Sequence, residues 1–134
     1  MFNTSNDLLI QRALSVLRIV SAYLLLQHGT AKLFGFPHVE YFDNLQLLSL
    51  IGVAGLLEVI GGALLLIGLM TRPVAFVLSG ELALAYFIGH ASNGHFLSPM
   101  LNEGESAVLF CFIFLFLAAA GGGRWSVDAA RARS

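Results

Sequence analysis

The sequence has few charged residues. Aspartate, glutamate, lysine and arginine together make up 11% of the 134 residues, whereas 57% are hydrophobic. A soluble domain of this size carries charges on about a quarter of its residues. Because so little polar surface cannot cover a globule in water, lipid must surround most of the chain. The composition therefore predicts a single integral membrane domain over residues 1–134.

Cysteine pairs and clusters of basic residues are also absent. The single cysteine, Cys111, excludes an intrachain disulfide and a Cys-x-x-Cys redox pair. Within its apolar run, the thiol is expected to behave as a small, inert hydrophobic group. The net charge is −1 and there is no basic run, which argues against nucleic acid as a partner. No nicotinamide or flavin fingerprint is present, so any electrons would come from a partner protein.

Four hydrophobic segments have about the 20-residue length that a bilayer crossing requires. We predict transmembrane helices at about residues 12–34, 48–69, 73–92 and 104–120, followed by a cytoplasmic tail at 121–134. Short connections favour antiparallel neighbours, so the predicted fold is all-α, an up-down-up-down four-helix bundle. A cleaved signal peptide is the alternative for the first segment. Residues 1–11 argue against it, because they contain no lysine or arginine and no small-x-small cleavage site follows the apolar run.

Basic residues gather at one end of the predicted bundle. Arg12, Arg18, Arg72 and the arginines of the tail fall on the same side, and Lys32 is the only lysine or arginine on the other. The positive-inside rule then places both termini in the cytoplasm.

Seven ionisable side chains lie inside these segments or at their edges, where each charge costs about 2.5–3.5 kcal/mol of insertion free energy. They are Arg18, His28, Lys32, Glu58, Glu81, His90 and Glu105. Depth along antiparallel helices separates them into two layers. The layer nearer the cytoplasm predicts a structural ion pair of Arg18 with Glu81 or Glu58. One glutamate is left over, as a protonated or proton-exchanging carboxyl.

The second layer, at the opposite end, contains His28, Lys32, His90 and Glu105. We expect Lys32 to pair with Glu105 there, and an apolar pocket to be lined by Tyr86 and Phe112. A quinone or phenolic ligand suits such a pocket, because its oxygens accept hydrogen bonds while aromatic walls stack on its ring. The alternative is that the polar residues are ordinary interfacial side chains and that the phenylalanines face lipid.

Two other ligands fit these residues less well. His28 and His90 could be paired axial ligands of a haem, but no other haem signature is present. A metal bound by His28, His90 and Glu105 would have suitable ligand types without the local spacing of a metal site. We therefore expect no haem, no metal and no covalently bound cofactor.

The chain resembles DoxX-like membrane proteins over residues 17–129. The matching stretches are LRIVSAYLLLQHGTAKLFGFP (17–37), GVAGLLEVIGGALLLIGLMTRP (52–73), FIGH (87–90), NEGESAVLF (102–110) and GGGRWSVDA (121–129). The resemblance implies a four-helix protein of the bacterial inner membrane, and many relatives are described as oxidoreductases. Some are similar to the membrane subunit of a thiosulfate to quinone oxidoreductase, and others accompany responses to quinones, catechols or oxidative stress.

The residues and the resemblance together predict a membrane redox component that binds a quinone or phenol and acts with a partner protein. The expected ligand-binding residues are His28, Lys32, Tyr86 and Phe112, and the expected catalytic residues are Glu58, His90 and Glu105. The alternative is a non-catalytic membrane scaffold or small-molecule carrier whose buried charges only specify packing. A proton-coupled exporter would need an aqueous path, for which four helices are few unless the protein forms a homo-oligomer.

Overall fold

A computed structural model describes residues 4–134, and in that range every regular element is a helix. The α-helices are α1 (Thr4–Phe34), α2 (Leu50–Ile67), α3 (Thr71–Ala85), α4 (Glu105–Ala120) and α5 (Val127–Arg133). Three stretches are long and apolar enough to cross a membrane: α1, α2, and α3 with its continuation to Asn93. α4 is apolar but shorter. The predicted all-helical class with membrane-spanning segments is therefore confirmed.

The helices differ clearly from the prediction in two respects. α1 begins at Thr4 rather than near residue 12, and at 1.5 Å per residue its 31 residues extend about 46 Å. A bilayer core is about 30 Å thick, so the polar first turns of α1 continue beyond it. The second difference is α5, which the sequence analysis did not predict within the tail.

Local sequence signals explain where α2 and its neighbours end. The hydroxyl of Ser49 caps α2 by accepting a hydrogen bond from the amide of Gly52. α2 stops at Gly68, whose φ of 75° lies in the left-handed region that glycine adopts without a Cβ penalty. α3 then begins at Thr71, so the connection between α2 and α3 is very short. Beyond Ala85, α3 continues as a π-helical turn, Tyr86–His90, and a 3-10 turn, Ala91–Asn93.

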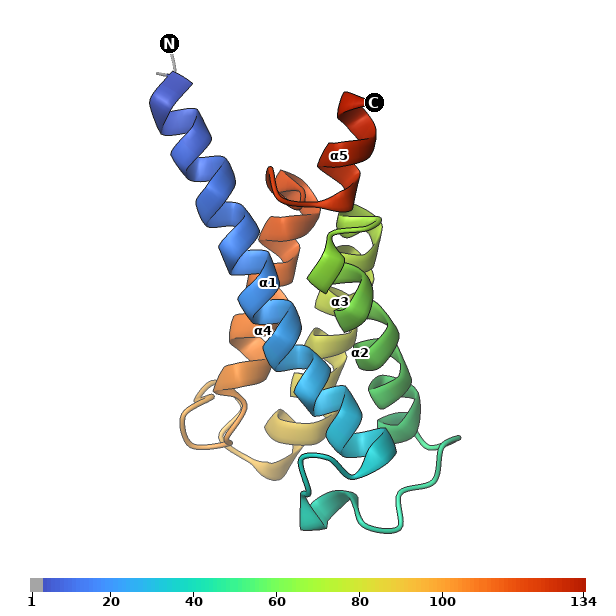
Figure 1. Cartoon of the computed structure of the whole chain (residues 1–134). Helices are drawn as coiled ribbons and strands as arrows, with labels where there is room; N and C mark the ends of the chain where they lie inside the picture. The colour runs from blue at the N-terminus through green and yellow to red at the C-terminus, as the bar shows by residue number, and fades with distance from the viewer. Residues whose placement is uncertain (1–3) are drawn as a thin grey trace.

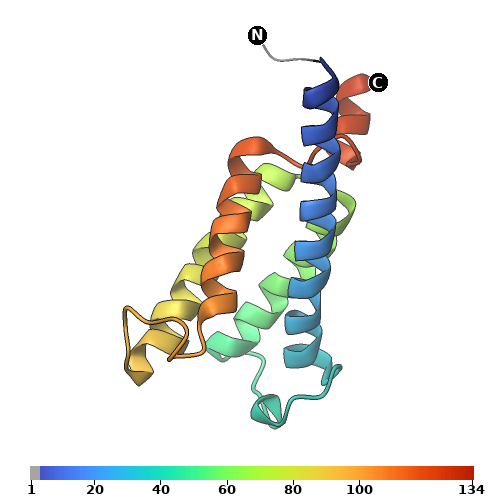
Figure 2. The same ribbon diagram turned by 90° about the vertical axis from the view of Figure 1, so that its left-hand side faces the viewer.

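The N- and C-terminal regions lie at the same end of the molecule (Figure 1), which we call the terminal end. The opposite end, the loop end, contains the connections at residues 35–49 and 94–104. α1 packs mainly along α2, and α3 packs mainly along α4. Figure 2 shows these two antiparallel pairs side by side, and contacts between the pairs are sparser than contacts within them.

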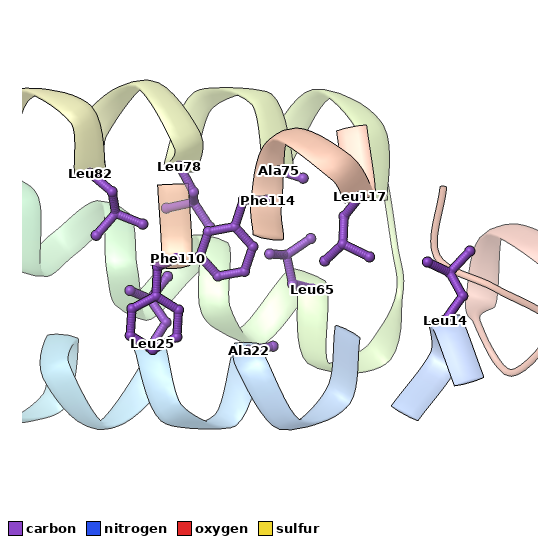
Figure 3. Packing of buried hydrophobic residues seen from close by; sticks show 10 residues of the cluster. All are labelled: Leu14, Ala22, Leu25, Leu65, Ala75, Leu78, Leu82, Phe110, Phe114 and Leu117. Atoms are coloured by element: carbon purple, nitrogen blue, oxygen red, sulfur yellow. The ribbon is translucent and has the colours of Figure 1, made fainter. Parts of the chain in front are cut away.

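The main hydrophobic core lies where the two pairs meet. Its central side chains are Leu25 from α1, Leu65 from α2, Leu78 and Leu82 from α3, and Phe110 and Phe114 from α4 (Figure 3). We call this contact the seam. The two phenylalanine rings are stacked with centroids 5.8 Å apart. Since all four long helices contribute to the seam, it fixes the position of one pair relative to the other.

Glycines bring α1 and α2 unusually close together. A Cβ atom added to Gly55 of α2 would lie 2.9 Å from the Cβ of Lys32. A Cβ atom added to Gly29 of α1 would lie 2.8 Å from Val59 and 3.0 Å from the Cβ of Glu58. Small residues permit this approach of two backbones. As a result, the side chains of Lys32 and Glu58 lie next to each other inside the α1–α2 contact.

Candidate functional site

The ammonium group of Lys32 and the carboxylate of Glu58 form an ion pair inside the membrane-spanning region. The Nζ atom donates to both oxygens of Glu58, at 2.7 and 2.8 Å. The side chain of Glu58 is 2% exposed and that of Lys32 is 13% exposed. The predicted pairing of Lys32 with Glu105 is therefore wrong.

Helix geometry explains this pairing. The Cα–Cβ bond of every helical residue tilts toward the N-terminus of its helix. α1 runs toward the loop end and α2 runs away from it. The side chain of Lys32 therefore leans toward the terminal end, and that of Glu58 leans toward the loop end. Lys32 and Glu58, which the sequence analysis placed in different layers, therefore meet at an intermediate depth.

Glu81 lies on α3 near this pair. Both of its carboxylate oxygens are buried, and neither has a hydrogen-bond partner within residues 4–134. The charges of Glu58 and Lys32 both act on the carboxyl group of Glu81. Because Glu58 already holds Lys32, Glu81 occupies the position of the predicted leftover carboxyl.

His28 is the fourth polar residue of this region, one turn before Lys32 on α1. Its side chain is exposed on the helix surface, and the charge of Lys32 acts on it. The imidazole ring meets the ring of Phe110 edge to face, with centroids 5.9 Å apart. We call His28, Lys32, Glu58 and Glu81 the charged cluster.

Arg18 is 1% exposed but does not pair with Glu58 or Glu81, so that prediction is also wrong. Its guanidinium group donates to three backbone carbonyls instead: those of Gly122, Trp125 at 2.7 Å and Leu66 at 3.5 Å. The planar, forked guanidinium suits several acceptors at once. Arg18 thus joins α1 to the end of α2 and to the tail.

His90 and Tyr86 take part in a hydrogen-bond network of the loop end rather than in a ligand pocket with His28. The hydroxyl of Tyr86 donates to the carbonyl of Phe96 at 2.7 Å and accepts from the side chain of Asn102 at 3.1 Å. The Nδ1 atom of His90 lies 3.1 Å from the carbonyl of Asn102. The predicted role of Tyr86 as a pocket wall does not agree with this buried structural position.

Asn102 was missed by the sequence analysis. Its side-chain oxygen accepts a hydrogen bond from the amide of Gly104 at 2.9 Å, two residues later. This is an Asx turn, and an asparagine two residues before a glycine at a helix start is the signal that could have indicated it.

The remaining two predicted site residues lie on the surface. Glu105 is exposed at the first position of α4. Phe112 is 64% exposed, so it points away from the seam that Phe110 and Phe114 occupy. The predicted pocket lining by Phe112 is wrong, and its position matches the alternative in which it faces lipid.

Within 4–134, no three histidine, cysteine, aspartate or glutamate side chains come together in a way that could hold a metal ion.

Comparison with known proteins supports one family. The family model described as DoxX matches residues 13–91. The chain belongs to the DoxX family. A protein from Haemophilus influenzae, described as uncharacterized, is 42% identical over 117 residues, which cover 86% of this chain and 87% of the relative. No solved structure matches the chain.

All four residues of the charged cluster lie within the DoxX match, whereas the tail lies beyond it. In the structure the tail is held tightly. The carboxylate of Asp128 accepts hydrogen bonds from the backbone amides of Met70 and Thr71, each at 2.8 Å, and so caps the start of α3. The amide of Trp125 donates to the hydroxyl of Ser15 at 3.0 Å. The tail of this DoxX protein is therefore part of the packed structure.

These contacts change the acidity of Asp128. Burial alone would raise its pKa. The hydrogen bonds from Thr71 and Met70, together with the charge of Arg131, outweigh that effect and hold the pKa of Asp128 below its usual value. The carboxylate form is the one that caps α3.

Two open pockets lie at the terminal end, away from the predicted ligand site. One has a volume of about 430 Å³ and lies between the start of α3 and the tail, with Thr71, Arg72, Gly122 and Asp128 in its wall. The other has a volume of about 450 Å³ and lies between the first turns of α1 and α5.

Proposed function

We propose that this DoxX-family protein is a quinone- or phenol-linked redox component of the bacterial inner membrane. The observation that carries the proposal is the buried carboxyl group of Glu81, which has no hydrogen-bond donor among the described residues and lies near the Lys32–Glu58 ion pair. Reduction of a quinone consumes protons as well as electrons. A quinone site within a bilayer therefore needs a group that carries protons.

Charge balance assigns the proton to Glu81. The carboxylate of Glu58 is neutralised by Lys32 through two hydrogen bonds. An ionised Glu81 would be a second buried anion without a donor, which is costly in an apolar environment. In this proposal Glu81 is neutral at rest and gives a proton to the bound quinone as the partner protein delivers electrons. Reduction to the quinol takes two electrons and two protons, so Glu81 takes up a proton from water after each transfer and returns to its neutral form.

The aromatic side of the seam is the proposed ligand position. His28 lies exposed against Phe110, whose ring also stacks on the buried ring of Phe114. α1 and α4 contact each other less than α2 and α3 do, and in this proposal the planar ring of the ligand enters from the lipid between α1 and α4. The imidazole of His28 would donate a hydrogen bond to a ring oxygen, and Phe110 would pack against the ring.

The proposal uses His28, Lys32, Glu58 and Glu81 and assigns no role to Tyr86, His90, Glu105 or Phe112. The proposal also includes a topology. Four helices cross the membrane in an up-down-up-down order, and both termini lie in the cytoplasm. The arginines at the terminal end support this orientation. A partner protein supplies the electrons, since the sequence has no nicotinamide or flavin fingerprint.

The test combines ligand detection with one substitution. Protein purified in mild detergent is analysed for co-purifying quinones by mass spectrometry, and a short-chain quinone is titrated while infrared difference spectra record carboxyl bands. We expect quinone above the lipid background and a protonated carboxyl band that disappears in Glu81→Gln. Glu105→Gln is the matched control and should keep the band. Absence of both the quinone and the band would contradict the proposal.

The second candidate function is a non-catalytic membrane scaffold or carrier. It is favoured by the observation that these charges already bind groups within the protein: Arg18 donates to three backbone carbonyls, and Lys32 donates to both oxygens of Glu58. In that case Glu58→Gln disrupts assembly, whereas Glu81→Gln changes neither ligand content nor any quinone-linked activity.

A further inference from the structure

The length of α4 leaves part of the membrane thickness to another segment. With 16 residues, α4 is about 24 Å long. This is about 6 Å shorter than the hydrocarbon core of a typical bilayer. The neighbouring stretch Thr71–Asn93 has 23 residues and extends about 34 Å. The two neighbours therefore end at different depths on at least one side.

The difference in depth between α4 and its neighbour α3 lies at the loop end. At the terminal end the side chain of Arg72, near the start of α3, donates to the carbonyl of Ala119, near the end of α4, so these ends are level. At the other end Gly104 lies against the ring of Tyr86, because a Cβ atom added to it would lie 2.6 Å from that ring. α4 therefore begins beside Tyr86, about two turns below Asn93.

The segment that fills this depth, residues 94–104, satisfies much of its own backbone. The amide of Ser98 donates to the carbonyl of His95 at 2.8 Å. The amides of Leu101 and Asn102 donate to the carbonyl of Ser98 at 2.9 and 3.1 Å. Irregular backbone at membrane depth is tolerated only where its polar groups have partners in the protein.

Buried side chains satisfy further carbonyls of the same segment. The hydroxyl of Tyr86 donates to the carbonyl of Phe96, and the side chain of Asn102 donates to the carbonyl of His95 at 3.2 Å. The imidazole of His90 forms a hydrogen bond with the carbonyl of Asn102. The loop is therefore folded on itself and tied to α3.

Most of the side chains that this loop leaves exposed are apolar, and the polar exceptions are His95 and Glu103. Leu97 is 89% exposed, and Phe96, Met100 and Leu101 are also exposed. On the helix that follows the loop, Leu109 of α4 is exposed as well.

We propose that residues 94–104 dip into the membrane at the loop end, with Phe96, Leu97, Met100 and Leu101 in the acyl region of the lipid. Exposed Glu103 and Glu105 place the loop at the boundary between headgroups and acyl chains rather than deeper. The loop completes the thickness that α4 does not span. Tyr86, His90 and Asn102 hold its backbone in the form that lipid tolerates.

Spin labelling tests this placement in the full-length protein. In a Cys111→Ser background, single cysteines are introduced at Leu97 and Leu101, labelled with a nitroxide and reconstituted in phosphatidylcholine–phosphatidylglycerol vesicles. Leu109→Cys is the lipid-facing control and Ser134→Cys is the aqueous control. Power saturation then compares the accessibility of each label to oxygen, which concentrates in lipid, and to a water-soluble nickel chelate.

We expect the ratio of oxygen accessibility to nickel-chelate accessibility at Leu97 and Leu101 to be several-fold higher than at Ser134. This ratio should approach the value measured at Leu109. A nickel preference like that of Ser134 would show that the loop lies in water and would overturn the proposal. Labels inaccessible to both reagents would overturn it as well, because protein rather than lipid would then cover the loop.

Discussion

At the residue scale, the direction of side chains decides which charges meet. Lys32 is close to the end of α1 and Glu58 is in the middle of α2, yet both lean toward each other because the two helices are antiparallel. Arg18 has a different environment, in which backbone carbonyls serve as acceptors and the charge of Asp128 acts on it. The two buried cations of the membrane-spanning helices therefore have distinct structural tasks.

Glu58→Gln is expected to destabilise the protein. It leaves the ammonium group of Lys32 buried without a counter-charge, and breaking a buried pair costs about 3 kcal/mol or more. The double variant Lys32→Met, Glu58→Gln should recover much of the loss. Thermal unfolding of the detergent-solubilised single and double variants measures this coupling, and purely additive effects would contradict it.

Arg18→Lys should loosen the tail although it keeps the positive charge. A single ammonium group cannot reproduce the planar fork that reaches the carbonyls of Gly122 and Trp125. We expect faster cleavage by trypsin within residues 121–134. Arg12→Lys, at an exposed position, serves as control. Equal cleavage rates in the two variants would argue against the role of Arg18 in holding the tail.

At the scale of elements, glycines set the distance between α1 and α2, and side chains from one element cap another. Gly55 lies directly beneath the Cβ of Lys32, so the ion pair depends on the helix contact as well as on its charges. Asp128, just inside α5, caps α3, and Ser49 caps α2. Helix ends are thus held by residues both near and distant in the chain.

Gly55→Ala should lower the stability of the bundle, because the added methyl group would lie 2.9 Å from Lys32 and 3.2 Å from Leu33. Overpacking of this kind costs about 1–3 kcal/mol. Gly80→Ala is the matched control, since a Cβ atom there meets nothing within 4 Å. It should stabilise α3 by up to about 1 kcal/mol. Thermal unfolding compares the two variants.

The cap provided by Asp128 should depend on pH. Its pKa is lower in the folded protein than the ordinary value of about 3.9. The stabilisation is therefore complete above that ordinary value and is lost as the pH falls through the lower, folded-state pKa. Relative to the native protein, Asp128→Asn should lose about 1 kcal/mol at neutral pH.

The loss caused by Asp128→Asn should shrink as the pH approaches the folded-state pKa. Unfolding of both proteins measured across this acidic range checks the sign, and a difference that grows on acidification would contradict it.

At the scale of the whole molecule, the two helix pairs are joined by a seam of apolar side chains and by the tail. The seam holds Leu25, Leu65 and Phe114 among its members, and the tail connects α1, α2 and α3 at the terminal end. In the charged cluster, His28, Lys32 and Glu58 lie nearer the loop end than Leu25 and Leu65 of the seam, on the side away from the tail. The position of the cluster is fixed from both pairs, because Glu58 and Glu81 come from different ones.

The orientation in the membrane is testable with alkaline-phosphatase fusions. In the proposed orientation, the arginines of the terminal end keep that end in the cytoplasm, so fusions at Asn44 and Asn93 should be active and a fusion after Ser134 should be inactive. Inactive fusions at both loop positions would reverse the proposed orientation.

The sequence alone determined the class of this protein. Its scarce charges and four apolar segments led to helices in lipid, and its motifs led to the DoxX family, because the physical requirement of a bilayer is written into composition and length. The same features located Glu58, Glu81, Lys32 and His28 on membrane-spanning segments.

Only the tertiary structure decided which of these residues meet. Depth along the chain placed Lys32 with Glu105, but pairing depends on side-chain direction and on the close approach at Gly29 and Gly55, which linear spacing does not contain. Arg18 was matched to a glutamate because carbonyl groups of the distant tail leave no sequence signal as acceptors. Those contacts exist only once α1, α2 and the tail pack together.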